Sequence, residues 1–241
     1  MVTLKMAIIF LMEQIRTPFS LIWTIMSPIV LFFFLHFNEI ELHYGDTAWL
    51  GKQISWFVGY ISFSVVLFNY CLYLVGRRES GFIATFVHNM DGRLLFIRSQ
   101  LIASLIMSIL YVFFFILVVL TGFQASPDYQ IVMIILKSIY INAFMMVSLT
   151  FMASFRVTFQ TASTIYSVLI TVCMVSGIVS LKYNEGIVYW INQVNPIAIY
   201  STILQSDQEL SLMTIFFYSI MLIISIISAL TFKTEPVWSS Q

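Results

Sequence analysis

Hydrophobic runs of about twenty residues recur along the chain, and they constrain its fold more than any other feature. A helix that crosses a membrane needs ~20 mostly apolar residues at about 1.5 Å rise per residue. Strands are not expected at these lengths, because open sheet edges cannot face lipid. The sequence therefore predicts an all-α membrane protein with six transmembrane helices. The runs lie at residues 19–37, 54–75, 99–121, 131–153, 162–181 and 212–232.

Charged side chains are too scarce for a soluble domain. They make up 9% of the chain, against ~25% in soluble proteins, while hydrophobic residues make up 60%. The formal net charge is zero, so no basic stripe is present to neutralise phosphates, and a nucleic-acid partner is not expected. Most of the 23 Phe residues are explained by lipid-facing bulk, and a cavity for a hydrophobic or amphipathic substrate is the alternative, in which the 13 Met residues would provide adaptable walls.

The sequence lacks the patterns that signal enzymes and cofactor sites. The three His residues do not have the spacing of metal ligands. Cys71 and Cys173 lie within apolar runs, where a free cysteine usually acts as a small buried side chain. The nearest approach to a phosphate loop, residues 45–53, has one residue too many and lacks the final Ser or Thr. We therefore expect no catalytic residue, no metal and no cofactor bound by this chain.

Residues 3–17 predict a separate helix before the first span. Lys5, Glu13 and Arg16 fall near one side of it, and apolar side chains fall on the other. These charges are unfavourable at the bilayer centre, so we expect an interfacial helix along the membrane surface. Pro18 then ends this helix and permits a turn into the membrane.

The Lys and Arg residues outside the spans predict the orientation of the chain. Cytoplasmic loops carry an excess of positive charge. With the N-terminus inside, eight such residues lie on the inner side and two on the outer side, which predicts a plasma-membrane protein with both termini in the cytoplasm. The inner residues are Lys5, Arg16, Arg77, Arg78, Arg93, Arg98, Arg156 and Lys233, and the outer ones are Lys52 and Lys182.

Gly76–Arg98 is the longest charged interruption between two apolar runs. Within it, Phe82, Ile83, Phe86 and Val87 share one face of a short helix. A cytoplasmic helix with an apolar face either docks on a separate protein or lies on lipid. We favour docking, and an ordinary positively charged inner loop is the simplest alternative.

Two stripes of small and hydroxyl side chains recur at steps of three and four residues within the predicted spans. Such side chains let membrane helices approach closely and hydrogen-bond. A substrate pathway lined by the same residues is the alternative, and the sequence leaves both open. The second span carries Ser55, Gly59, Ser62, Val66, Asn69, Tyr73 and Gly76, and the fifth carries Thr161, Thr164, Val168, Thr171 and Val175.

The stretch 182–211 between the last two predicted spans is too apolar for an aqueous loop. It contains two apolar pieces separated by a Pro, and each piece is too short to cross the membrane. Such pieces predict a re-entrant helical element on the outer face. Its landmark residues are Tyr189, Trp190, Asn195, Pro196 and Tyr200.

Lys137 is the one charged residue within a predicted span. It lies six residues from the outer end of the span, about 9 Å deep at 1.5 Å per residue. Its stem is long enough for the amine to reach the interface, and contact with a substrate or partner is the alternative. No carboxylate lies in the middle of a span, which disfavours an ion-coupled carrier.

Three landmarks follow one another along nearly the whole chain. They are Arg16-Thr17-Pro18 with Pro28 ten residues later, Arg78-Glu79-Ser80-Gly81 with its short apolar helix, and Asn195-Pro196 with Tyr200. Together they resemble the permease subunits of type-2 ATP-binding-cassette (ABC) exporters. In that family the segment after the second span carries a coupling helix, which docks in a groove of a separate ATPase.

The resemblance implies partners as well as site residues. It implies two cytoplasmic ATPase subunits that hold ATP and Mg, and a second permease copy or a paralogous permease, since six spans form half a pathway in the family. It implies that the apolar segment after the fifth span closes the exit. The residues that it implies for ATPase coupling are Glu79, Gly81, Phe82, Ile83, Phe86 and Val87.

The expected function is therefore that of a permease subunit in an ATP-driven exporter, with ATP hydrolysis on the partner. The expected substrate is a hydrophobic or amphipathic compound, such as a peptide toxin, a bacteriocin or a drug-like molecule. A stand-alone secondary carrier or channel is the alternative. A membrane-bound enzyme or an inert scaffold is a further alternative, disfavoured by the missing catalytic residue sets.

Overall fold

A computed structural model describes residues 2–16, 18–86, 90–180, 185–205 and 212–232. Within these ranges all regular structure is helical and no strand is present, which confirms the predicted all-α fold. The elements are α1 (Val2–Ile15), α2 (Pro18–Leu35), the 3₁₀ turn η1 (Phe37–Glu39), α3 (Thr47–Ser64), the π-helical η2 (Val65–Leu72), α4 (Tyr73–Glu79), α5 (Phe82–Phe86), α6 (Met90–Gly122), α7 (Tyr129–Leu149), α8 (Phe151–Ser154), α9 (Phe159–Ser180), α10 (Gly186–Val194), α11 (Pro196–Gln205) and α12 (Leu212–Leu230).

Several of these helices have the length and composition of membrane spans. Among the described residues, four helical stretches are long and apolar enough to cross a membrane: Thr47–Glu79, Met90–Gly122, Tyr129–Ser154 and Phe159–Ser180. The chain is therefore a membrane protein. The first and last predicted spans form the 18-residue α2 and the 19-residue α12, which contain shorter apolar stretches. The count of six crossings stays a prediction.

The charged segment between the second and third predicted spans is shorter than the sequence indicated. Helix α4 continues to Glu79, and α6 already begins at Met90. The 33 residues of α6 extend over about 50 Å, well beyond the ~30 Å of membrane hydrocarbon. The extension is held by the protein itself, since Arg93 Nη1 donates to the Leu230 carbonyl at 3.0 Å.

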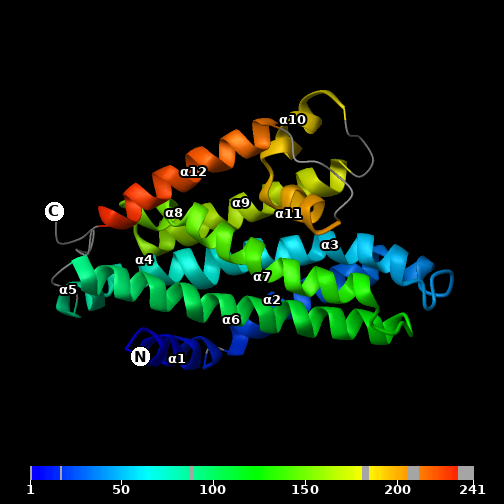
Figure 1. Cartoon of the computed structure of the whole chain (residues 1–241), viewed down its shortest axis with the longest axis horizontal. Helices are drawn as coiled ribbons and strands as arrows, with labels where there is room; N and C mark the ends of the chain where they lie inside the picture. The colour runs from blue at the N-terminus through cyan, green and yellow to red at the C-terminus, as the bar shows by residue number, and fades with distance from the viewer. Residues whose placement is uncertain (1, 17, 87–89, 181–184, 206–211, 233–241) are drawn as a thin grey trace.

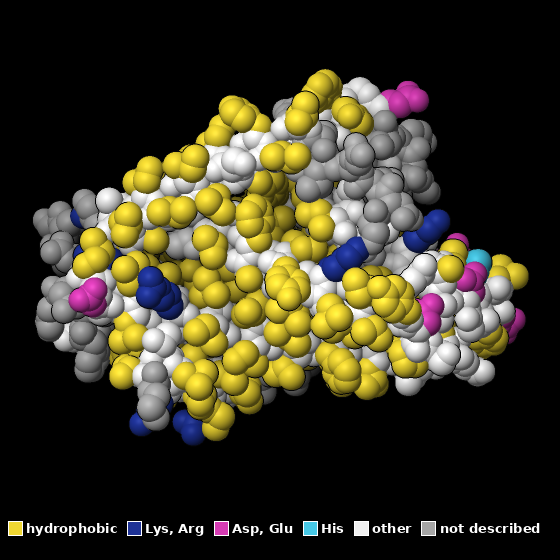
Figure 2. Space-filling model, in the orientation of Figure 1, with side chains coloured by type: hydrophobic (Ala, Val, Ile, Leu, Met, Phe, Trp, Pro, Cys, Tyr) yellow, Lys and Arg dark blue, Asp and Glu magenta, His cyan; other side chains and the backbone are white. Residues whose placement is uncertain are grey.

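The helices form an elongated bundle (Figure 1). Helix α1 packs along the first half of α6, while α12 lies on the opposite side of the bundle against α7 and α8. The start of α1, the α4–α5 turn and the end of α12 lie at one end, and the starts of α3 and α7 lie at the other. Figure 2 shows hydrophobic side chains across the middle of the bundle, with Asp, Glu, Lys and Arg gathered mainly toward its ends.

The bundle core contains polar as well as aromatic contacts. Phe32 is fully buried, with its ring centroid 5.0 Å from that of Phe57 and 5.7 Å from that of Phe115. In the π-helical η2 the Asn69 carbonyl accepts from Gln100 Nε2 at 2.6 Å and from a Ser hydroxyl of α6 at 3.0 Å. The wider π turn leaves a carbonyl available, and α6 supplies donors for it.

Some residues used for the orientation fall outside the described ranges. They are Lys182 and Lys233, and Thr17 of the first family landmark lies outside them too. Helix α1 ends at Ile15 and α2 begins at Pro18, so the predicted break at this position is present. The side of the membrane on which each end of the bundle lies stays a prediction.

Gly59 lies where α3 crosses α11 in close contact. A Cβ atom there would lie 2.9 Å from the Ile197 carbonyl oxygen and 3.2 Å from Tyr200 Cβ. We expect Gly59→Ala to lower the free energy of unfolding by ~1–2 kcal/mol, because the helices must separate, despite a helix-propensity gain of about 1 kcal/mol. Gly51→Ala is the matched control, since its Cβ would lie 3.6 Å from Gln130 Oε1. If the two variants have the same melting temperature in detergent, the close approach of α3 and α11 at Gly59 is contradicted.

Candidate functional site

The turn between α4 and α5 is the centre of the predicted coupling segment. Helix α4 ends with Ser80 N donating to the Gly76 carbonyl at 2.9 Å. Gly81 then adopts a φ of +73°, a left-handed conformation that glycine reaches without steric strain. Helix α5 starts directly afterwards, and Thr85 Oγ1 donates to the Phe82 carbonyl at 2.8 Å. The sequence placed a short helix here, and the structure contains one of five residues.

The side chains of α5 do not all face outward as the docking hypothesis expected. Ile83 is fully buried within the chain's own core. Phe82 is half-buried, with its ring 4.8 Å from the Arg77 guanidinium carbon and 6.4 Å from the Phe96 ring. Thr85 is exposed. Two of the four apolar residues assigned to a partner thus pack against the chain itself, because α5 folds back on α4 and the Phe82 ring lies beside Phe96 of α6.

Part of the predicted coupling face lies outside what the structure describes. Val87 is not among the described residues, and of Phe86 only the backbone is described. Glu79 lies at the end of α4 with its side chain mostly buried, and its Oε1 is 3.8 Å from Arg78 Nε. The docking role of these residues stays a prediction.

Arg78 joins the α4–α5 turn to the start of α9. Its side chain is only 1% exposed. Nη1 donates to the Ala153 carbonyl at 3.1 Å, and Nη2 donates to the Val157 carbonyl at 2.9 Å. Ala153 belongs to α8, and Val157 lies in the connection between α8 and α9. One planar guanidinium therefore holds α4, α8 and the approach to α9 in a fixed arrangement.

Arg77 makes a different contact, toward α1. It forms an ion pair with Glu13, which also accepts from the Tyr73 hydroxyl at 2.6 Å. The Arg77 guanidinium carbon lies 5.0 Å from the centre of the Tyr73 ring. These residues and Phe159 border a cavity of about 310 Å³ between α1, α4 and α9. Helix α1 and the predicted coupling segment are thus connected directly.

The hydroxyl stripe of the second predicted span lies inside the bundle. Ser55 and Ser62 are fully buried, while Asn69 and Tyr73 are half-buried. Ser55 Oγ donates to the Gly51 carbonyl at 2.7 Å. The stripe runs from the contact with α11 to the contact with α6, as expected for a helix-packing seam. Whether a pathway adjoins it stays a prediction.

The hydroxyl stripe of the fifth predicted span faces outward. Thr161, Thr164 and Thr171 are exposed on α9, whose buried face is formed by other residues, Tyr166 among them. Thr164 Oγ1 and Thr171 Oγ1 donate to carbonyls one turn earlier in α9, at 3.1 and 2.8 Å. These hydroxyls are satisfied within their own helix, so the two stripes that looked alike in the sequence occupy different environments.

The predicted outer element consists of two short helices joined at Asn195-Pro196. Asn195 is 3% exposed, and its Nδ2 donates to the Cys173 carbonyl at 2.8 Å and to Ser176 Oγ at 3.1 Å. Its Oδ1 accepts from Ile197 N at 3.0 Å, which caps α11. Pro196 occupies the first position of α11, where its missing N–H removes no hydrogen bond.

The two short helices differ in burial. Tyr189 and Trp190 of α10 are exposed. Tyr200 of α11 is 1% exposed, and its hydroxyl donates to the Ser138 carbonyl of α7 at 2.9 Å. Helix α11 therefore belongs to the bundle core, between α3 and α7, whereas α10 covers α9 from outside. A re-entrant course in a membrane stays a prediction.

Sequence reasoning missed the structural role of Arg78, which it assigned to membrane topology and to one of the three family landmarks. A signal was present in the spacing. Cys71, Leu74, Val75 and Arg78 recur at the three- and four-residue steps of one helix face, and all four are buried. Glu13 was likewise interpreted as part of a solvated helix side, and no local pattern indicated its pairing with Arg77.

Further features of the described residues bear on chemistry. The described residues contain no group of three or more His, Cys, Asp or Glu side chains that could hold a metal ion. Cys71 and Cys173 are free and buried, as expected from their positions in apolar runs. No family model matches the chain, and no solved structure matches it.

Proposed function

We propose that this chain is the permease subunit of an ATP-driven exporter, which moves a hydrophobic or amphipathic substrate out of the cell. The substrate class is a peptide such as a toxin or bacteriocin, or a drug-like compound. ATP and Mg are held by two cytoplasmic ABC-type ATPase subunits, so this chain performs no hydrolysis itself. A second permease copy, identical or paralogous, completes the pathway.

One observation carries this proposal: the α4–α5 turn is tied rigidly to the start of a long apolar helix. Arg78 connects the turn to the carbonyls of Ala153 and Val157, just before α9. A force applied to α5 would therefore reach the α8–α9 connection through the two hydrogen bonds of Arg78. This supports a role in which a separate protein moves the helices from that end.

The proposal includes a membrane arrangement. Helices α2 and α12 are the first and last of six spans, and the end of the bundle that carries the α4–α5 turn faces the cytoplasm with both termini. Helices α10 and α11 form the outer re-entrant element. The close packing of α11 between α3 and α7 supports this placement, because such an element must be held by neighbouring spans.

Purification of the full-length chain from its own membranes tests the proposal. We expect a protein with a Walker-type phosphate loop to copurify, and transport in reconstituted vesicles to require ATP. Transport that proceeds equally well without ATP, with no ATPase retained, would instead identify a stand-alone carrier or channel. If the purified chain neither transports a substrate nor retains an ATPase, both the exporter and the carrier or channel are contradicted.

Thr85 offers a sharper test of the coupling surface. Its side chain is exposed on α5, so Thr85→Asp leaves the chain's own core intact. We expect the variant to insert and melt as the wild type does, but to lose copurification of the ATPase, because a carboxylate would be buried without a partner in the docking groove. The matched control is Thr121→Asp, at an exposed position near the opposite end of α6. If both variants retain the ATPase, α5 is not the docking surface, and its segment is an ordinary positively charged inner loop.

A further inference from the structure

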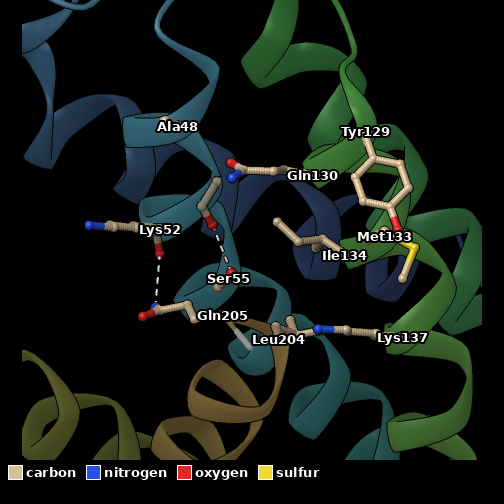
Figure 3. Close-up of a pocket in the computed structure, with 11 residues that line it drawn as sticks. Ala48, Lys52, Ser55, Tyr129, Gln130, Met133, Ile134, Lys137, Leu204 and Gln205 are labelled. Atoms are coloured by element: carbon tan, nitrogen blue, oxygen red, sulfur yellow. Dashed lines mark hydrogen bonds between the residues drawn. The ribbon is translucent and has the colours of Figure 1, made fainter. Parts of the chain in front are cut away.

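Where α3 and η2 pack along α7, buried hydroxyl groups have hydrogen-bond partners at two levels of the bundle. Near the start of α3, Ser55 Oγ donates to the Gly51 carbonyl at 2.7 Å, as a dashed line in Figure 3 marks. Near the end of α7, the Tyr70 hydroxyl is paired with Thr150 Oγ1 at 2.9 Å. At both levels the chain itself satisfies the polar groups that it buries.

Asn142 lies on α7 between these two levels, and its amide is not satisfied. The side chain is fully buried, and neither Nδ2 nor Oδ1 has a hydrogen-bond partner among the described residues. An amide in this state is unfavourable, because no solvent replaces the missing partners inside a membrane bundle. Folded proteins pair most buried polar atoms either with other protein groups or with ordered water. The amide of Asn142 therefore requires a partner from outside the chain.

Ser108 of α6 lies at the same height in the bundle as Asn142. Helices α6 and α7 run in opposite directions and contact each other (Figure 1). Ser108 lies 14 residues before Gly122, the end of α6, and Asn142 lies 13 residues after Tyr129, the start of α7. At about 1.5 Å per residue, these separations are about 21 and 20 Å. Ser108 is also fully buried, and its Oγ has no hydrogen-bond partner within the described ranges.

A third buried polar side chain, Ser62, reaches this height from α3. Helix α3 contacts both α6 and α7, and it begins beside the start of α7, where Thr47 Oγ1 donates to Asp128 Oδ2 at 2.6 Å. Ser62 lies 15 residues after Thr47, about 22 Å along the helix axis. It is fully buried. Three helices that contact one another thus bring buried polar side chains to one level.

The chemistry of these side chains favours a small neutral ligand. The amide nitrogen donates, the amide oxygen accepts, and a hydroxyl group does both. Helices α3 and α7 contain no Asp or Glu, and Asp91, the acidic residue of α6, lies in its first turn. A cation at this level would therefore lack a counter-charge, which is unfavourable inside a membrane. Water both donates and accepts, and a buried water typically makes about three hydrogen bonds.

We propose that ordered water is bound between α3, α6 and α7, with hydrogen bonds to Asn142, Ser108 and Ser62. The amide nitrogen donates to this water and the amide oxygen accepts from it, while the two hydroxyls supply its remaining partners. The water joins three helices that are long and apolar enough to cross a membrane. Such water-mediated bonds are nearly as favourable in enthalpy as direct ones. This inference does not depend on the proposed ATP-driven transport.

X-ray radiolytic labelling of the full-length protein, in detergent and in water enriched in ¹⁸O, tests this site. Hydroxyl radicals form from the water present at each position, so a buried side chain is oxidised only where bound water lies beside it. The reporter is Met146, which is fully buried and lies one helical turn after Asn142 on the same face. We expect labelling of Met146 in the wild type and about tenfold less in Asn142→Leu, because the water loses both amide contacts.

A pair of serine variants provides the matched comparison. Ser108→Ala removes one hydroxyl from the proposed site, so labelling of Met146 should decrease, but less than in Asn142→Leu. Ser99→Ala is the control, since Ser99 is also a fully buried serine of α6, but its hydroxyl donates to the Leu95 carbonyl at 2.7 Å. Labelling of Met146 should not change in this variant.

The proposal is overturned if Met146 is not labelled in the wild type, since the site is then dry. It is also overturned if labelling is unchanged in both Asn142→Leu and Ser108→Ala, or if Ser99→Ala decreases it equally. Labelling that disappears when sodium chloride replaces choline chloride would overturn it in favour of a cation site. If Asn142→Leu fails to fold, its melting temperature shows this, and the comparison of Ser108→Ala with Ser99→Ala then decides.

Discussion

Replacing Arg78 with Met should lower the free energy of unfolding by about 3 kcal/mol. The Ala153 carbonyl would lose its donor in a buried environment and the Val157 carbonyl in a partly buried one, and each such loss typically costs ~1–3 kcal/mol. The removal of a buried charge offsets part of this effect. Arg78→Lys should also be destabilised, because one ammonium cannot reproduce the two parallel bonds of the guanidinium.

Labelling of Cys71 gives a local measurement of this effect. Cys71 is fully buried, and its thiol lies 3.5 Å from the Leu149 carbonyl, shortly before α8. In a chain that keeps Cys71 as its single cysteine, Arg78→Met should increase the labelling rate and lower the melting temperature in detergent. Arg77→Met is the neighbouring control. Its partly exposed ion pair with Glu13 is worth about 1 kcal/mol or less. Similar behaviour of the two variants would show that Arg78 does not join these helices.

Asn195→Ala should lower the free energy of unfolding by about 2–4 kcal/mol. The substitution removes the cap of α11 and the two hydrogen bonds to α9, all from a side chain that is 3% exposed. Loss of the cap alone typically costs ~1 kcal/mol. The Cys173 carbonyl would be left without this donor, which adds to the cost. Helices α10 and α11 should then separate from α9 before the rest of the bundle unfolds.

The second buried cysteine distinguishes this local opening from global unfolding. In a chain that keeps only Cys173, Asn195→Ala should increase its labelling rate more than Arg78→Met does. With Cys71 alone, the order should reverse. Asn192→Ala is the control for Asn195→Ala, because Asn192 lies in α10, is half-buried, and its Oδ1 has no hydrogen-bond partner among the described residues. If the labelling rates of both cysteines change together in every variant, the bundle unfolds as one cooperative unit. Arg78 and Asn195 would then not stabilise separate parts of it.

The positions of the helices could be predicted from the apolar runs, but their ends could not. The run 54–75 indicated the second span, whereas the continuous helix reaches from Thr47 to Glu79. A hydropathy pattern detects only the apolar part of a helix, which is the part suited to the membrane interior. The remaining turns are stabilised by Asp46, which caps the start, and by Arg78, which finds partners beyond the apolar stretch.

The candidate site shows the same division. The short helix after Gly81 was predicted from the spacing of its apolar residues, and the joint at Asn195-Pro196 from the Pro between two short apolar pieces, and both are present. The directions in which the apolar side chains of α5 point were not predicted. Ile83 and Phe82 have the composition of a docking face, yet they pack against the chain itself, because an apolar face carries no information about which surface covers it.

The sequence by itself determined the helical class, the membrane environment and the breaks at Pro18 and Asn195-Pro196, because hydropathy and turn chemistry act over a few residues. Only the tertiary structure decided which helix faces lie inside. Arg77 and Arg78 are neighbours with opposite partners, and the similar hydroxyl stripes through Ser62 and Thr164 lie inside and outside the bundle. Lipid is as apolar as the core of the bundle, so no hydrophobic pattern orients a membrane helix, and close packing and hydrogen bonds do so instead.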